Sequence, residues 1–91
     1  MLFVSFLTPI GGTPKERVAR RLEWNYPEDV RLVAEYWLQC PDPSAIVIFE
    51  ADNVLAMEKS RVYWGDLFEI TTVPAMTGEE GIAFVRGMMK K

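Results

Sequence analysis

The order of strand-like and helix-like segments constrains the fold of this chain more than any other feature. Alternating apolar residues and turn signals predict strands at residues 2–7, 30–39, 45–50 and 67–73. Helical spacing and capping residues predict helices from residue 14 to about 24, over 53–64, and from residue 78 onward. The resulting order is strand, helix, strand, strand, helix, strand, followed by one more helix.

This order is typical of a split β-α-β unit, so the sequence predicts one ferredoxin-like α+β domain over residues 1–91, with an antiparallel sheet and an added C-terminal helix. Ninety-one residues, 49% hydrophobic and 25% charged, suit a single globular domain. The apolar run 1–10 has no positive charge before Lys15 and is too short to span a bilayer, so we expect a buried strand there.

The ends of the predicted helices carry the strongest local signals. Residues 13–16 and 77–80 each read as a capping box, in which a threonine side chain and a glutamate three residues later satisfy backbone N–H groups. Asp52 is the expected N-cap of the second helix, and Gly65 is expected just past its end. These signals fix where the helices of the domain begin.

Alternate positions along each predicted strand divide the sheet residues between its two faces. The first set is almost wholly apolar and is expected beneath the first two helices: Leu2, Val4, Phe6, Leu32, Ala34, Tyr36, Leu38, Val47, Phe49, Phe68 and Ile70. The second set is more mixed: Phe3, Ser5, Leu7, Arg31, Val33, Glu35, Trp37, Ile46, Ile48, Glu50, Leu67, Glu69, Thr71 and Val73.

The apolar members of the second set predict a partner, because a sheet face left to water is normally polar. The simplest partner is a second copy related by a two-fold axis. Two such sheets facing each other form a dimeric α/β barrel with an interior that holds a small, largely apolar ligand. The alternative is that the C-terminal helix covers this face of its own sheet.

Two segments of the chain resemble a known family. They are residues 49–53, Phe-Glu-Ala-Asp-Asn, and residues 64–74, which contain Trp-Gly-Asp-Leu-Phe-Glu-Ile and end in Val-Pro. The sequence resembles an uncharacterised prokaryotic domain-of-unknown-function family in the dimeric α/β-barrel, ferredoxin-like superfamily. The resemblance implies the fold and a homodimer but no reaction. Where relatives often have Trp-His, this chain has Tyr36-Trp37.

The chain contains no histidine, which removes the commonest general base and metal ligand. Ser-His-Asp and Cys-His catalysis within one chain type are thereby excluded, and we expect neither a metal nor a cofactor. The net charge of −3 disfavours nucleic acid and anionic membranes as partners. A single cysteine, Cys40, permits no internal disulfide and favours a cytoplasmic location.

Five residues of the second set are the candidate ligand-binding residues: Ser5, Glu35, Trp37, Glu50 and Glu69. Trp37 would be an aromatic wall, and Ser5 an isolated hydroxyl without an adjacent base. A carboxylate held among apolar neighbours has a raised pKa and acts as an acid or a base. The alternative is that these glutamates pair with arginines such as Arg31 or reach solvent at the rim.

The sequence therefore predicts a homodimeric small-ligand-binding α/β-barrel protein without an assignable reaction. One alternative is a cofactor-free enzyme that uses Glu50 or Glu69 for proton transfer on a small organic substrate. The other is a structural or protein-interaction module that binds no ligand. Catalytic residues are not assigned, and whether the protein is an enzyme stays open at this stage.

Overall fold

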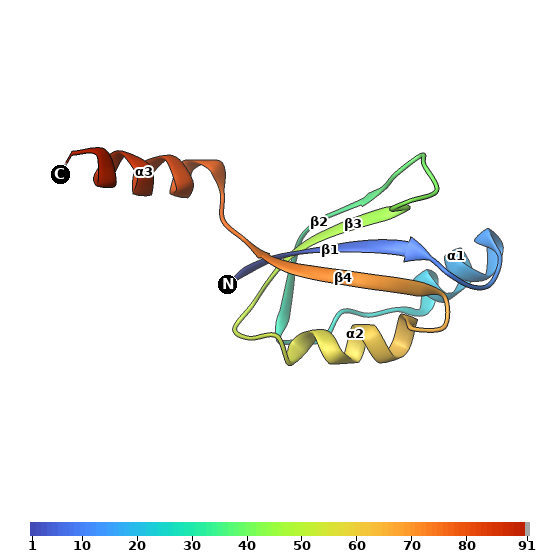
Figure 1. Cartoon of the computed structure of the whole chain (residues 1–91). Helices are drawn as coiled ribbons and strands as arrows, with labels where there is room; N and C mark the ends of the chain where they lie inside the picture. Colours follow the sequence, from blue (N-terminus) through green and yellow to red (C-terminus); the bar gives the residue numbers. More distant parts are fainter. Residues whose placement is uncertain (91) are drawn as a thin grey trace.

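The computed structural model describes residues 1–90 and contains a four-stranded antiparallel sheet and three helices (Figure 1). In chain order the elements are β1 (Leu2–Pro9), α1 (Pro14–Glu23), β2 (Val30–Trp37), β3 (Ala45–Ala51), α2 (Ala56–Trp64), β4 (Phe68–Ala75) and α3 (Gly78–Met89). The strands lie in the order β2-β3-β1-β4, and all neighbours are antiparallel. This arrangement confirms the predicted ferredoxin-like α+β fold with an added C-terminal helix.

The capping signals place the starts of α1 and α3 correctly but not that of α2. Thr77 and Glu80 form the complete capping box of α3. The predicted cap of α2 was wrong: the helix begins at Ala56, and Asp52 does not cap it. Instead, the Asn53 side chain accepts a hydrogen bond from the Leu55 N–H at 2.9 Å, which holds residues 53–55 in a turn and delays the helix.

The loop before α1 is held against the loop that follows α2. The N–H of Ile10 donates to the Leu67 carbonyl at 2.9 Å, and a side chain at Gly11 would collide with the carbonyl oxygen of Asp66. Gly12 has a φ of 69°, which a residue with a side chain rarely adopts. The Gly-Gly pair thus allows the close approach and sharp turn that lead into α1.

The predicted faces of β1 were the wrong way round. Phe3 pairs with Phe49, and both are buried on the face that α1 and α2 cover, which we call the helix-side face. Ser5 pairs with Val47 on the same face, and Leu7 follows it two residues later. Each face of β1 carries apolar residues and one polar residue, Ser5 on one and Thr8 on the other, so the sequence pattern does not decide which face lies against the helices.

A bulge also reverses the second half of β2. The pairing shifts between Leu32 and Ala34, so one extra residue, Val33, is inserted into the strand. Glu35 then pairs with Val47 and therefore lies on the helix-side face rather than opposite it. Strands β3 and β4 have the predicted faces, except that the expected position of Leu67 was wrong: this residue precedes β4 and is buried in the core with Trp64 rather than on the opposite face. Their helix-side residues, including Val47, Phe49, Phe68 and Ile70, are the ones expected there.

The hydrophobic core lies between the helix-side face and α2. One cluster packs Ala56 of α2 against Phe3 and Phe49, whose rings are 5.5 Å apart. A second cluster packs Trp64 against Leu67 and Phe68. No residue of α1 is buried, so this helix adds little to the apolar core.

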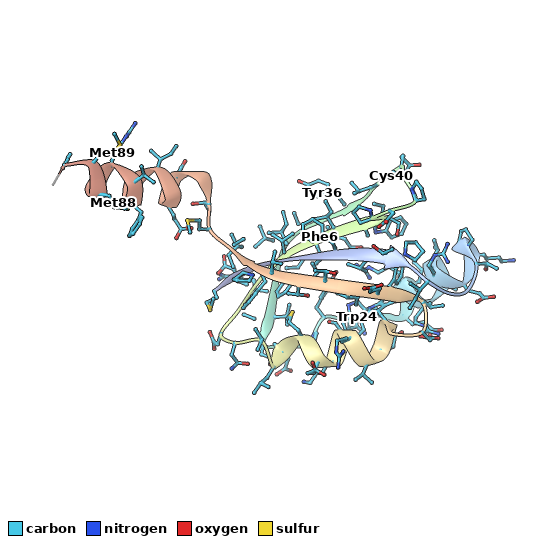
Figure 2. The ribbon with its side chains drawn as sticks, in the orientation of Figure 1. Phe6, Trp24, Tyr36, Cys40, Met88 and Met89 are labelled. Atoms are coloured by element: carbon cyan, nitrogen blue, oxygen red, sulfur yellow. The ribbon has the colours of Figure 1, made fainter. Side chains whose placement is uncertain are left out.

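The opposite side of the sheet is uncovered, and we call it the open face. Phe6 and Tyr36 lie on this side of the ribbon, and Trp24 lies on the other, between the sheet and α2 (Figure 2). The open face is formed mainly by apolar side chains that are half-buried or exposed in the single chain: Leu2, Val4, Phe6, Ala34, Tyr36, Ile46, Ile48 and Val73. The predicted apolar face therefore exists, although β1 and β2 contribute different residues to it.

Helix α3 does not cover the open face of its own sheet. It projects beyond the end of the sheet at which β1 begins and β4 ends (Figure 1). The molecule is accordingly elongated, measuring 54 × 29 × 16 Å, and no residue of α3 is buried. The alternative in which α3 folds back over the sheet is not the arrangement of this structure.

Candidate functional site

A large cavity of about 1010 Å³ lies between the helix-side face and the two helices that cover it. Its floor is the sheet, where Val47, Phe49 and Ile70 line it, and its outer wall includes Val18 of α1 and Met57 of α2. Most of the lining is apolar or aromatic. Its volume is at the upper end of the range typical of small-molecule sites. The fold therefore leaves room for a ligand beside its core.

Two hydroxyl groups lie together on the cavity floor. Ser5 of β1 and Thr72 of β4 are directly opposite in the sheet, and their oxygens are 2.7 Å apart. Ser5 is only 6% exposed, so the hydrogen bond to Thr72 satisfies a hydroxyl that is otherwise surrounded by apolar groups. Because each hydroxyl oxygen has two lone pairs and only one proton joins the two, the pair retains hydrogen-bonding capacity for a ligand.

Glu35 is the centre of a polar cluster on another wall of the cavity. Its carboxylate accepts two hydrogen bonds from the Arg21 guanidinium, both 2.9 Å, one from the Tyr26 hydroxyl at 2.8 Å and one from the Trp37 indole N–H at 2.7 Å. The hydrogen bonds from Arg21, aided by those from Trp37 and Tyr26, outweigh burial and lower the pKa of Glu35 to about 2. Burial and the neighbouring carboxylate raise the pKa of Tyr26.

Glu35 therefore stays ionised and is poorly suited to act as a proton-transfer group near neutral pH. The expectation of a raised pKa was wrong for this residue because it assumed an apolar surrounding. The pairing alternative holds, with Arg21 of α1 as the partner. Trp37 lines the cavity as an aromatic wall and also donates to Glu35.

Arginine side chains attach α1, the outer wall of the cavity, to the rest of the domain. Arg17 donates to the carbonyl oxygens of Gly11 at 2.8 Å and Gly12 at 3.2 Å. Arg20 donates to the Tyr63 carbonyl at 3.0 Å and forms an ion pair with Asp66. The basic side of α1 therefore contacts the rest of the domain and does not face solvent alone. Apolar residues of this helix stay largely unburied: Val18 is 42% exposed and Leu22 is 79% exposed.

The polar groups of the cavity favour a neutral ligand over an anion. Each of the arginines that line it, Arg17, Arg21 and Arg61, already donates to a carbonyl oxygen or a carboxylate of the protein. An anion would have to compete with these acceptors. A neutral apolar molecule with one polar end would instead bury its body against the walls and reach the hydroxyl pair of Ser5 and Thr72.

The other two candidate residues lie on the opposite side of the sheet, so the five candidates do not form one site. Glu50 is on the open face, as predicted, where it forms an ion pair with Arg31. Glu69 is also on the open face and is exposed. Ser5, Glu35 and Trp37 line the helix-side cavity instead. Among the described residues, Glu69 has no side-chain hydrogen bond or ion pair, and the only side-chain partner of Glu50 is Arg31.

Three residues of the site were missed at the level of sequence: Arg21, Tyr26 and Thr72. The basic residues of α1 alternate with glutamates, a pattern that is typical of a solvated helix face. Thr71 and Thr72 are adjacent in one strand, so one of them must share a sheet face with Ser5. A hydroxyl pair between neighbouring strands was therefore the sequence signal that could have identified Thr72. Tyr26 lies in a loop and had no periodicity to identify it.

Within residues 1–90, no group of three or more Asp, Glu or Cys side chains is close enough together to hold a metal ion. None of the helices in this same part of the chain combines the length and the apolar composition needed to cross a membrane.

A family model described as a domain of unknown function, DUF3303, matches residues 2–89, nearly the whole length of the chain. The chain belongs to the DUF3303 family. This result confirms the predicted membership of an uncharacterised domain family. No curated protein and no solved structure matches the chain significantly. The DUF3303 description names no reaction, so none is assignable from the family.

Proposed function

We propose that the protein binds a small, neutral, largely apolar molecule in the helix-side cavity. The observation that carries this proposal is the cavity of about 1010 Å³, lined mostly by apolar side chains, with the hydroxyl pair of Ser5 and Thr72 on its floor and charged groups that are already paired within the protein. Small-molecule sites combine these features: mostly apolar walls and a few placed polar groups that orient the ligand. The proposed site is therefore beside the core, and not between two sheets.

We propose also that the protein is a cytoplasmic homodimer of the dimeric α/β-barrel type, in which the open faces of two sheets approach each other. The strand order β2-β3-β1-β4 and the uncovered apolar face support this arrangement. A two-fold axis would make one self-complementary face serve both subunits. The exposed free thiol of Cys40 fits a reducing compartment.

The ligand proposal is tested by titrating the protein with a neutral apolar fluorescent probe, N-phenyl-1-naphthylamine. We expect saturable binding of one probe per subunit, with a change in tryptophan fluorescence because Trp24, Trp37 and Trp64 all line the cavity. Absence of saturable binding would refute the proposal and favour a protein-interaction module.

Two neighbouring residues of β3 provide a matched pair of variants that locates the site. Val47→Phe fills the floor of the cavity, whereas Ile48→Phe adds the same kind of bulk to the open face. We expect Val47→Phe to weaken probe binding at least tenfold, about 1.4 kcal/mol, and Ile48→Phe to leave it unchanged. The reverse result would place the ligand between the two sheets and contradict the helix-side site. Circular dichroism of both variants checks that the fold is retained.

A further inference from the structure

Helix α3 is amphipathic, and its apolar side is unoccupied. At about 100° per residue, one side of the helix gathers five apolar side chains that are each at least half exposed: Ile82, Phe84, Val85, Met88 and Met89. The opposite side carries the charged residues together with Ala83: Glu79, Glu80, Arg86 and Lys90. Met88 and Met89 are visible at the far end of the projecting helix in Figure 2.

A helix of this kind needs a surface to pack against. It has 12 residues, a length at which isolated helices are marginal in water. Gly81 and Gly87 in its interior each cost about 1 kcal/mol relative to alanine. The capping box at Thr77 and Glu80 offsets only part of this cost. Packing of the apolar side is therefore the main available source of stability, and its own domain offers none because α3 projects away from it.

Residues 1–90 contain a second apolar surface that no other element covers, the open face, and its size can be compared with that of a dimer interface. Four strands of seven or eight residues present a face of roughly 500 Å² at the usual strand spacing. Two facing sheets alone would bring together roughly 1,000 Å² of flat sheet area in total, a small contact beside the roughly 1,200–2,000 Å² of accessible surface that a stable interface usually buries. A second copy of the chain supplies both the facing sheet and an α3 helix about 18 Å long that adds to the contact.

We propose that α3 is an exchanged arm: each α3 extends across the dimer and packs its apolar side on the part of the partner's open face that the two facing sheets leave uncovered. This inference rests on the homodimer proposed above and adds to it a specific contact. Twisted sheets pack closely over only part of their surfaces, which leaves room at the edges for a helix. The arm enlarges the interface beyond the two facing sheets and provides α3 with the surface it lacks.

The test compares Val85→Glu, on the apolar side of α3, with the matched control Ala83→Glu on its polar side. Both changes introduce the same charge into an exposed position of the same helix. Sedimentation velocity over a range of concentrations gives the dimer dissociation constant of each variant. We expect Val85→Glu to raise this constant at least tenfold, and Ala83→Glu to leave it within about twofold of wild type.

Hydrogen exchange of the α3 amides provides a second readout that does not depend on either variant. In the wild-type dimer we expect these amides to be protected, and their protection to be lost on dilution to monomer. The arm proposal would be wrong if Val85→Glu leaves the dimer dissociation constant unchanged and the α3 amides exchange hydrogen as fast as those of an unfolded segment. The homodimer proposal would still stand in that case. A monomeric wild-type protein would overturn the homodimer itself, and the arm with it.

Discussion

The Glu35 cluster permits a quantitative prediction about stability and pH. The Glu35 side chain is 14% exposed and the Arg21 side chain 32% exposed, so the pair is only partly screened by solvent. The folded protein lowers the pKa of Glu35 to about 2 from its ordinary value of 4.5. At about 1.4 kcal/mol per pH unit this corresponds to roughly 3 kcal/mol, which we reduce to about 2 kcal/mol for the exposure of Arg21.

Replacing Glu35 with glutamine removes this charge and leaves Arg21 without its partner. We therefore expect Glu35→Gln to lower the free energy of unfolding by about 2 kcal/mol at pH 7, and the melting temperature by roughly 10 °C for a domain of this size. The measurement is urea and thermal unfolding, followed by circular dichroism. Glu28→Gln, at an exposed carboxylate in the preceding loop, is the control and should change stability by less than about 0.5 kcal/mol.

The sign of the pH dependence follows from the lowered pKa. A carboxylate with a lowered folded-state pKa stabilises the protein fully above about pH 4.5, and this contribution is lost as the pH falls toward 2. The difference in stability between wild type and Glu35→Gln should therefore be constant from pH 6 to 8 and fall to less than half by about pH 3. A difference that stays constant down to pH 3, or an unchanged stability at pH 7, would refute the assigned role of Glu35.

Three further changes test other parts of the structure. Phe3→Ala removes the most deeply buried side chain and should cost about 3–5 kcal/mol in chemical unfolding, whereas a cost below 1 kcal/mol would contradict the helix-side assignment of β1. A double-mutant cycle of Ser5→Ala and Thr72→Val should give a coupling energy of about 0.5–1.5 kcal/mol, and additive effects would show that the two hydroxyls do not interact. Gly11→Ala should destabilise the protein by at least 1 kcal/mol because its Cβ would meet the Asp66 carbonyl, and a neutral effect in thermal unfolding would contradict that close approach.

The sequence was sufficient to predict the fold because each element carried its own signal. Turn residues and caps separated the segments, and their order is compatible with few topologies. The capping box at Thr77 is present in full. The start of α2 was not predictable in the same way, because Asp52 and Asn53 are both favourable capping residues. In the structure neither caps the helix, and the Asn53 side chain forms a local turn with the Leu55 N–H instead.

The two faces of the sheet were harder to predict than its topology. Strand β1 is mostly apolar at both parities, and Ser5, a polar residue at its centre, looked like a group facing away from the core. In the structure Ser5 is buried because Thr72 on the neighbouring strand satisfies it. The bulge at Val33 has no local sequence signal, yet it moves Glu35 to the other face. The face on which such a residue lies depends on its contacts with neighbouring strands, and the periodicity of a single strand contains no information about those contacts.

Native mass spectrometry of the freshly purified protein, with and without N-phenyl-1-naphthylamine, is the decisive test of ligand binding in the helix-side cavity. We expect each subunit to retain one small molecule, either from the expression host or as the added probe, and Val47→Phe to lose it. We also expect the dominant species to be a dimer. A wild-type protein that holds no small molecule under either condition would contradict the proposed ligand site in the helix-side cavity.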